Sequence, residues 1–441
     1  MKSVALAIHD RSPQGIATGI ARMVTTGDLA PGDRLPTVRE LAAELGVSPA
    51  TVSHAWQTLA AAGLITSRGR SGSFVRSSAR EWMPRRYQGL DGSVEARLDL
   101  PRGTPDPELL PALGPALTRV SARAGTVSYQ QKPDIPELHD HLRATWPSPV
   151  ESITVVNGAL DAIDRVLATV VRFGDRVVVE NPTFPPFMDL LDQYGLEPVG
   201  VGVDDEGMRP DAFGAALATS PAAVLLQPRA HNPTGTSLTA ARAEQLAGIL
   251  RRSRTAESTI VLEDDASGSI STAPDVSLAT WLPDRVLHVR SFSKSHGPDL
   301  RIGALGGPRA LLDRVVARRL LGPGWTSRMM QAILHELLTD AESVAQVDAA
   351  RRVYADRQLA LTAALAVHGV ELRAGDGLNA WVRVDDERAA MVHLTAAGIR
   401  VAPGGPFQLG DSAPHVRVTV GVLPDAETAA VAAALAAATT A

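Results

Sequence analysis

The chain contains no cysteine, and lysine is nearly absent because only three of its 43 basic residues are lysines. The absence of cysteine excludes disulfides and thiolate metal sites, and we predict no metal site. No apolar run reaches the roughly 18 residues that a membrane span needs, and the N-terminus lacks the pattern of a secretory signal. We therefore expect a cytoplasmic protein without a membrane partner.

The scarcity of lysine draws attention to Lys294. It lies in "SFSKSHGPDLRIG", residues 291–303, directly after an apolar run that resembles a strand. Arginine stays protonated in proteins, whereas a lysine amine can lose its proton and act as a nucleophile. Because the chain otherwise uses arginine for positive charge, Lys294 is the candidate for an amine that the chemistry requires.

Length and charge indicate more than one domain. The 441 residues exceed an ordinary single domain, and 45% hydrophobic with 21% charged residues is typical of a globular protein. The first 80 residues carry nine Lys or Arg against five Asp or Glu, although the whole chain has a net charge of -5. A basic N-terminal part on an acidic remainder favours a polyanion partner for that part alone, but charge by itself does not decide this.

Helix signals dominate the first 80 residues. Ser12-Pro13 can open one helix, Thr37 with Glu40 forms a capping box for a second, and Ser48-Pro49 can open a third. The second and third helices are separated only by "GVS", which is helix-turn-helix spacing. The strand-like runs "LITS" and "SFVRS" flank residues 68–72, so they predict a hairpin with a basic, glycine-containing tip.

The run "GDLAPGDRLPTVRELAAELGVSPATVSHAWQTLAAAGLITSRGRSGSFV" resembles the winged helix-turn-helix domain of GntR-type bacterial regulators. The resemblance implies binding to double-stranded DNA, with the helix that begins after Ser48 in the major groove. Many relatives have arginines where this chain has Pro49 and Ser53, so base-specific contacts stay open, as does a winged helix used only for protein contacts. The residues that the resemblance assigns to DNA are Arg39, Ser48, Thr51, Arg68, Arg70 and Gly72.

A linker is predicted over residues 77–96, which lack a clean period and contain Pro84, Gly89 and Gly92. From residue 97 on, short apolar runs alternate with helical stretches, which predicts a mostly parallel sheet covered by helices on both faces. In such sheets ligands bind at the carboxyl ends of the strands. The strand-like runs are residues 153–156, 176–180, 222–227, 259–263 and 285–289.

Polar and small residues follow these runs. They comprise a small-residue turn at 157–159, the aromatic Phe184, the amide Asn232, the acid Asp264 and the amine Lys294. Each residue alone is compatible with a surface loop or with the core. Together they place an amine, an acid, an amide, an aromatic ring and anion-binding groups at one edge of a sheet.

This set, and residues 97–441 as a whole, resembles the fold-type I enzymes that use pyridoxal 5'-phosphate, with a smaller α+β domain at about 325–441. The resemblance implies that Lys294 forms a Schiff base with the cofactor, that Asp264 pairs with its pyridine nitrogen and that Asn232 bonds its phenolic oxygen. It further implies that Phe184 stacks on the ring. The groups implied around the phosphate are Gly158, Ala159, Ser291, Ser293 and Arg301.

Two further assignments also come from the resemblance. Tyr129 occupies the position that reaches into the phosphate site of a partner subunit, which implies a homodimer. Arg417, with Gly103, occupies the position that binds the carboxylate of a substrate or effector, for which a bidentate guanidinium is well suited.

A winged helix at 1–76 joined through a linker to this second domain resembles the MocR-type subfamily of GntR regulators. The resemblance implies a bacterial transcription factor that senses a small amine, an amino acid or the cofactor itself through an aldimine at Lys294. It also implies an operator with paired half-sites. Ala266 stands where relatives usually have tyrosine, so turnover stays open. A working aminotransferase with a DNA-binding head, or a DNA-binding protein without cofactor, are the alternatives.

Overall fold

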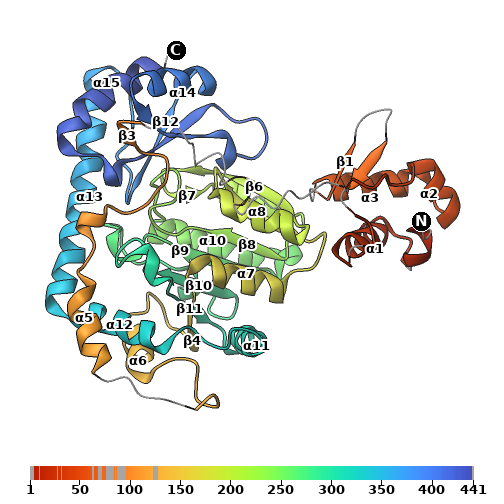
Figure 1. Cartoon of the computed structure of the whole chain (residues 1–441), viewed down its shortest axis with the longest axis horizontal. Coiled ribbons are helices and arrows are strands. Elements are labelled where there is room, and N and C mark those ends of the chain that lie inside the picture. Colours follow the sequence, from red (N-terminus) through yellow and green to blue (C-terminus); the bar gives the residue numbers. More distant parts are fainter. Residues whose placement is uncertain are drawn as a thin grey trace. The chain divides into compact units, whose positions relative to one another are not determined.

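The computed structural model describes residues 4–8, 10–26, 28–30, 32–61, 64–67, 72–75, 84, 86, 96–122 and 128–439. The chain divides into two compact units, one built around the N-terminal helices and one around an eight-stranded sheet (Figure 1). Most of the predicted linker, including Gly89 and Gly92, lies outside the described residues.

The N-terminal unit contains three helices followed by an antiparallel hairpin, which confirms the predicted winged helix-turn-helix fold. Its core consists of fully buried aliphatic side chains that the three helices contribute, such as Ile16, Leu41 and Leu59. The capping box is present, because the Thr37 hydroxyl accepts from the Glu40 amide and the Glu40 carboxylate accepts from the Thr37 amide. The elements are α1 (Pro13–Thr26), α2 (Val38–Leu45), α3 (Pro49–Ala61), β1 (Ile65–Ser67) and β2 (Ser73–Val75).

The large sheet has the strand order β4-β11-β10-β9-β8-β5-β6-β7. Strands β8, β9 and β10 run parallel, as predicted, whereas β11 is antiparallel to both of its neighbours. The sequence "GALGG" of β11 lacks the branched residues that mark strands, so this strand was not predicted. The strands are β4 (Ser152–Val156), β5 (Arg176–Asn181), β6 (Glu197–Asp204), β7 (Gly207–Met208), β8 (Ala223–Leu226), β9 (Ile260–Asp265), β10 (Val286–Ser291) and β11 (Gly303–Gly307).

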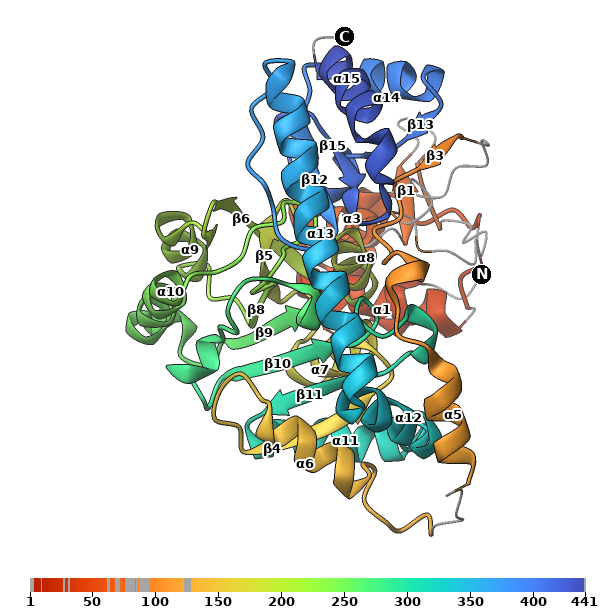
Figure 2. The ribbon, with the colours of Figure 1, turned by 90° about the vertical axis from the view of Figure 1, so that its left-hand side faces the viewer.

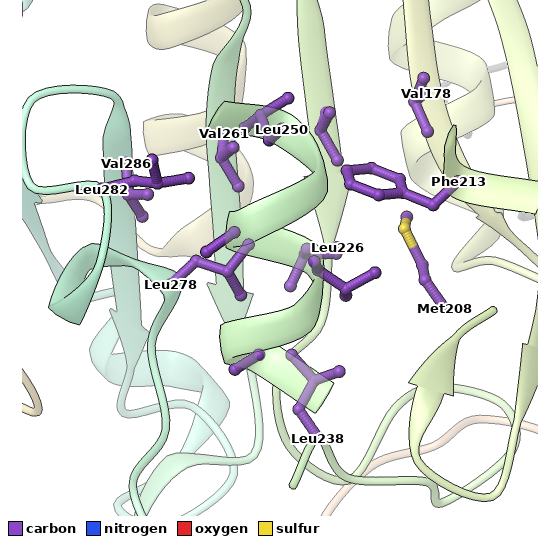
Figure 3. Close-up of a cluster of buried hydrophobic side chains, with 14 of the residues drawn as sticks. Val178, Met208, Phe213, Leu226, Leu238, Leu250, Val261, Leu278, Leu282 and Val286 are labelled. Carbon is purple, nitrogen blue, oxygen red and sulfur yellow. The ribbon is translucent and has the colours of Figure 1, made fainter. Parts of the chain in front are cut away.

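Helices cover the sheet, and Figure 3 shows part of the resulting core. Leu226 of β8 and Val261 of β9 belong to the same buried cluster as Leu250 and Phe213, which come from two helices (Figure 3). No helix within the described ranges combines the length and the apolarity that crossing a membrane requires. The helices of this region are α5 (Leu113–Ser121), α6 (Pro136–Ala144), α7 (Ala159–Val170), α8 (Pro185–Tyr194), α9 (Pro210–Leu217), α10 (Ala240–Arg252), α11 (Arg309–Leu320) and α12 (Arg328–Thr339).

A long helix, α13 (Ala341–Val367), runs from the side of the large sheet to a smaller C-terminal α+β region (Figure 2). In that region β12, β15 and β14 form an antiparallel sheet, and a two-stranded parallel sheet joins β13 to β3. Leu98 of β3 and Leu100 lie in the core of this C-terminal region. The elements are β3 (Leu98–Asp99), β12 (Asn379–Arg383), α14 (Glu387–Ala396), β13 (Ile399–Arg400), β14 (Ala402–Pro403), β15 (His415–Thr419) and α15 (Thr428–Thr439).

Candidate functional site

Ionisable and polar side chains lie at the carboxyl ends of β9 and β10 in the large sheet. Asp264 and Asp265 close β9, and Ser291 closes β10, three residues before Lys294. In both strands buried apolar residues precede the polar end. Burial of these apolar side chains in the core therefore determines the position of the polar side chains at the strand ends. Parallel pairing sets Val289 of β10 opposite Asp264, which brings the two strand ends to the same edge.

Lys294 lies at the centre of this edge. Its amine donates a hydrogen bond of 2.5 Å to the main-chain carbonyl of Gly103. Desolvation, together with the positive charges of Arg417 and Arg301, lowers the pKa of Lys294 to about 8, although the negative charge of Asp264 opposes this shift. A larger fraction of the amine is therefore neutral near pH 7 than in an ordinary lysine, which suits a nucleophile.

Asp264 is 2% exposed, and its two carboxylate oxygens differ. Oδ2 accepts a 2.8 Å hydrogen bond from the Gln227 amide, whereas Oδ1 is buried and has no hydrogen-bond partner among the residues that the structure describes. Burial raises the pKa of Asp264 to about 6, and the bond from Gln227 limits this rise. A buried carboxylate oxygen without a donor costs free energy, and it fits the protonated ring nitrogen of pyridoxal phosphate.

Arg417, in the middle of β15, connects the C-terminal region to this edge. Its guanidinium donates to the Asn232 side-chain oxygen across 3.1 Å and to the main-chain carbonyl of Pro101, and it lies 4.8 Å from the Phe407 ring centroid. Gly103 has φ +62°, and a Cβ there would lie 3.2 Å from Arg417. The structure thus brings together Asn232, Arg417 and Gly103, which the resemblance assigned to one site.

An anion could be held beside Gly158. This residue has φ +96°, and a Cβ there would lie 3.3 Å from the Arg301 guanidinium, so glycine permits the close approach. Helix α7 begins at the next residue, Ala159, and leaves main-chain amides free at its N-terminus. Ser291 is buried, and its hydroxyl accepts from the Ser293 amide across 3.3 Å. A guanidinium, amides and a hydroxyl of this kind suit a phosphate.

The structure also describes the surroundings of three further positions that the sequence singled out, Phe184, Tyr129 and Ala266. Phe184 is partly buried in the loop between β5 and α8. Tyr129 is 87% exposed, and its ring lies 5.7 Å from that of Trp325. Ala266 contributes no hydroxyl after Asp265, and the nearby His296 ring is engaged by Ser295 and Phe292.

Three contributors to the site had not been singled out in the sequence. Gln227 bridges Asp264 and Asn232, Glu180 accepts a bond from the Gln227 main chain, and Pro101 acts through its carbonyl. A polar residue at the end of an apolar run was the available signal for Gln227. Main-chain carbonyls have no such signal, because every residue carries one.

The predicted DNA-binding residues lie on the helix-turn-helix and the wing. Arg39 is exposed in the first turn of α2, and the Ser48 hydroxyl accepts from the Thr51 amide at the start of α3. Gly72 has φ +101°, and a Cβ there would lie 3.1 Å from Nε of Arg34, a basic residue that had not been singled out. Arg68 and Arg70 lie outside the described residues.

Two protein families match separate parts of the chain. Residues 14–75 match the gntR family of bacterial regulatory proteins, and residues 98–435 match the class I and II aminotransferases. The second match alone covers more than half of the chain.

Two regulators resemble the chain over nearly its full length. The vitamin B6 salvage pathway transcriptional repressor PtsJ of Salmonella typhimurium is 35% identical, and the alignment covers 95% of this chain and 96% of PtsJ. The HTH-type transcriptional regulator TauR of Rhodobacter capsulatus is 31% identical, with 88% of both chains covered. Both relatives therefore share the two-part organisation along the chain.

Solved aminotransferases resemble the larger part in fold. The α-aminoadipate aminotransferase LysN of Thermus thermophilus has a TM-score of 0.70 at 22% identity, covering 81% of this chain and 97% of LysN. An archaeal alanine:glyoxylate aminotransferase has a TM-score of 0.71 at 22% identity, covering 81% and 98%. These structures show the fold of the larger part, whereas the family matches and the two regulators show that the chain belongs to the GntR family of bacterial transcriptional regulators, in the MocR-type group that carries a class I and II aminotransferase domain.

Proposed function

We propose that this transcriptional regulator binds pyridoxal 5'-phosphate at Lys294 and senses a small amine, an amino acid or pyridoxal phosphate itself. The proposal is carried by one arrangement: an amine with a pKa of about 8 lies near a buried carboxylate whose Oδ1 has no donor in the part of the chain that the structure describes. A lysine amine and a lone carboxylate are the two groups that the aldehyde and the ring nitrogen of pyridoxal phosphate require.

The side chains have separate roles in this proposal. The Lys294 amine binds the aldehyde, Oδ1 of Asp264 accepts from the ring nitrogen, and the Asn232 side chain bonds the phenolic oxygen. Arg301 and the amides at Gly158–Ala159 hold the phosphate, with Ser291 and Ser293 beside them and Phe184 against the ring. When bound, the cofactor supplies an electron-withdrawing ring and a carbonyl that can exchange between amines.

Two observations bear on the effector. Arg417 is buried near Lys294, so a carboxylate-bearing amine would meet a guanidinium suited to bidentate binding. The relative PtsJ is described as a repressor of vitamin B6 salvage, which supports pyridoxal phosphate itself as the signal. An amino acid and the cofactor would both use the same pocket, so the two possibilities require a titration to separate them.

The DNA-binding part of the proposal concerns the N-terminal unit and a second subunit. Arg39, Ser48, Thr51 and the wing at Gly72 are the described groups that would contact double-stranded DNA, and Arg68 and Arg70, which lie outside the described residues, are proposed to contact it as well. We propose a homodimer in which Tyr129, which is exposed in the single chain, reaches the partner's phosphate site. A homodimer would bind paired half-sites, and we propose a cytoplasmic location because the protein would act on DNA.

The test is the visible absorbance of the purified protein after addition of pyridoxal phosphate, with Lys294→Ala as the control. We expect a new band in the wild type only, and we expect amino acids or amines titrated against it to shift the band and alter footprints on operator DNA. The absence of a band in both proteins would contradict cofactor binding and leave only the DNA-binding function.

A working aminotransferase is the second candidate, favoured by the intact contact between Asn232 and Arg417. Ala266 counts against it, because the hydroxyl that relatives place there is missing. This candidate predicts conversion of an amino acid with a keto acid when the loaded protein is incubated with a broad panel of both. Cofactor binding without conversion would rule it out and retain the sensor.

A further inference from the structure

Gln227 follows the last residue of β8 and is 3% exposed. Its side-chain nitrogen donates to Oδ2 of Asp264 across 2.8 Å, and its side-chain oxygen accepts from the Asn232 amide across 2.8 Å. One buried amide therefore connects the two residues that, in the proposed function, bind the ring nitrogen and the phenolic oxygen of the cofactor.

The two bonds together define which way the Gln227 amide faces. The main-chain amide of Asn232 can only donate, so the group that faces it must be the oxygen of Gln227. The nitrogen of Gln227 must then face Asp264, and it can only donate. Oδ2 of Asp264 is thus satisfied by a donor of fixed orientation, whereas Oδ1 is left without one among the described residues.

The main chain of Gln227 is also anchored. Its amide donates to Oε2 of Glu180 across 2.8 Å, and Glu180 is a buried residue of β5. Burial raises the pKa of Glu180 well above its usual range, and burial lowers the pKa of the neighbouring His231 to about 3. The His231 ring is therefore neutral near pH 7, and burial favours the protonated form of Glu180, whereas Oδ1 of Asp264 has no donor among the described residues.

We propose that Gln227 is a positioning residue, which orients Asp264 so that Oδ1 faces the pyridine nitrogen of pyridoxal phosphate and which holds the main chain of Asn232 so that its side chain lies beside the phenolic oxygen of the same ring. The inference rests on the proposed function and adds a residue that acts through Asp264 without touching the cofactor. Loss of the Gln227 donor also favours the protonated form of Asp264, since this bond lowers the pKa of the carboxyl. A protonated Asp264 is a poorer acceptor for the ring nitrogen.

A purely structural role for Gln227 predicts something different. A cross-link between β5, β8 and β9 would affect the stability of the sheet, and its loss would weaken every ligand to the same degree. A positioning role instead affects the ring nitrogen selectively. The comparison therefore needs two ligands that differ only at that atom: pyridoxal phosphate and an analogue with carbon in place of the ring nitrogen.

The experiment measures the affinity of the full-length protein for both ligands in the wild type and in Gln227→Met, which preserves side-chain length but removes both hydrogen bonds. We expect Gln227→Met to lower the preference for pyridoxal phosphate over the carbon analogue by about tenfold, the usual effect of a hydrogen bond to a charged group. Affinity for the carbon analogue should change much less. Gln331→Met is the matched control, because Gln331 is also fully buried and hydrogen-bonded, but on α12.

A second variant separates the two bonds and guards against misfolding. Gln227→Glu retains an acceptor for Asn232 but loses the donor to Asp264 when ionised, so we expect the preference to fall at pH 8 and to recover partly at pH 6. Equal weakening of both ligands, or an unchanged preference in both variants, would overturn the positioning role. Failure of the wild type to bind pyridoxal phosphate would instead overturn the proposed function.

Discussion

The amine of Lys294 donates to the main-chain carbonyl of Gly103 across 2.5 Å. The same loop is held by a second main-chain contact, because the carbonyl of Pro101 accepts from Arg417. A ligand that binds the Lys294 amine must therefore replace its bond to Gly103, and it must find the amine unprotonated. The pKa of this amine consequently governs how fast an aldehyde can bind.

The association of pyridoxal phosphate should accelerate as the pH rises through about 8. Desolvation and the nearby guanidinium groups lower the pKa of Lys294 to that value, so the neutral, nucleophilic form grows between pH 7 and 9. Stopped-flow absorbance with excess protein measures the rate across this range. A midpoint near 10 would show that Lys294 behaves as an ordinary lysine, and Lys294→Ala should give no signal at any pH.

Asp264→Asn should stabilise the cofactor-free protein and weaken pyridoxal phosphate binding. Burial raises the pKa of Asp264 from 3.8 to about 6, so the folded protein binds more protons than the unfolded chain between these values and loses stability as the pH rises. The carboxamide removes this loss, and we expect a gain of about 3 kcal/mol at pH 7 that falls below about 1 kcal/mol near pH 4. Denaturant unfolding at both pH values measures it.

The neighbouring carboxylate supplies the control for this prediction. Asp265 accepts from Arg229 across 2.5 Å in a buried ion pair, so Asp265→Asn should destabilise the protein at pH 7. The same substitution at adjacent positions thus has opposite expected signs. A loss of stability in both variants would contradict the assignment of Asp264 as a carboxylate that awaits a ligand.

Arg417→Lys should reduce discrimination between an amino acid and the amine that lacks its carboxylate. Lysine keeps the positive charge but cannot form the paired hydrogen bonds of a guanidinium. We expect the preference for the amino acid, read from the absorbance of the loaded protein, to fall by about tenfold. Arg400→Lys, on β13, is the control and should leave the preference unchanged. An unaltered preference in Arg417→Lys would argue for pyridoxal phosphate as the effector.

Arg39→Ala should weaken operator binding and reduce its salt dependence. A side chain that neutralises one phosphate contributes about -0.9 to the slope of log affinity against log salt concentration. Titration by fluorescence anisotropy at several salt concentrations measures this slope. Arg252→Ala, an exposed arginine at the end of α10, serves as the control. A weakened affinity with an unchanged slope would mean that Arg39 does not contact a phosphate.

Local signals in the sequence predicted local structure well. The capping box of Thr37 and Glu40 depends on residues three apart, and the short runs of branched apolar residues in β9 and β10 favour strands. Lys294 stood out because lysine is rare in this chain. In each case the interaction that determines the structure joins residues close together in the sequence, or the residue type alone indicates the function.

Contacts between distant residues were not predictable in the same way. Gln227 and Asp264 are 37 residues apart, and their bond exists only because β8 and β9 pair in register. Strand β11 was not predicted because its sequence consists mostly of glycine and alanine. These small residues permit close packing and give no pattern of large buried side chains. The pairing of β3 with β13 likewise joins segments 301 residues apart without a sequence signal.

The contacts that the loop at 101–103 makes with Lys294 and Arg417 have a consequence for genetic screens. Both acceptors are main-chain carbonyls, which every amino acid possesses, so exchanging side chains leaves them chemically intact. In an alanine scan, the effect of Gly103→Ala would report the steric conflict between the added Cβ and Arg417. The same substitution would leave the main-chain carbonyl that accepts from Lys294 in place, so the scan would not detect this hydrogen bond. Replacing the peptide bond after Gly103 by an ester would weaken its carbonyl as an acceptor. This substitution would reveal how far the site depends on the hydrogen bond from Lys294, which side-chain mutagenesis does not test.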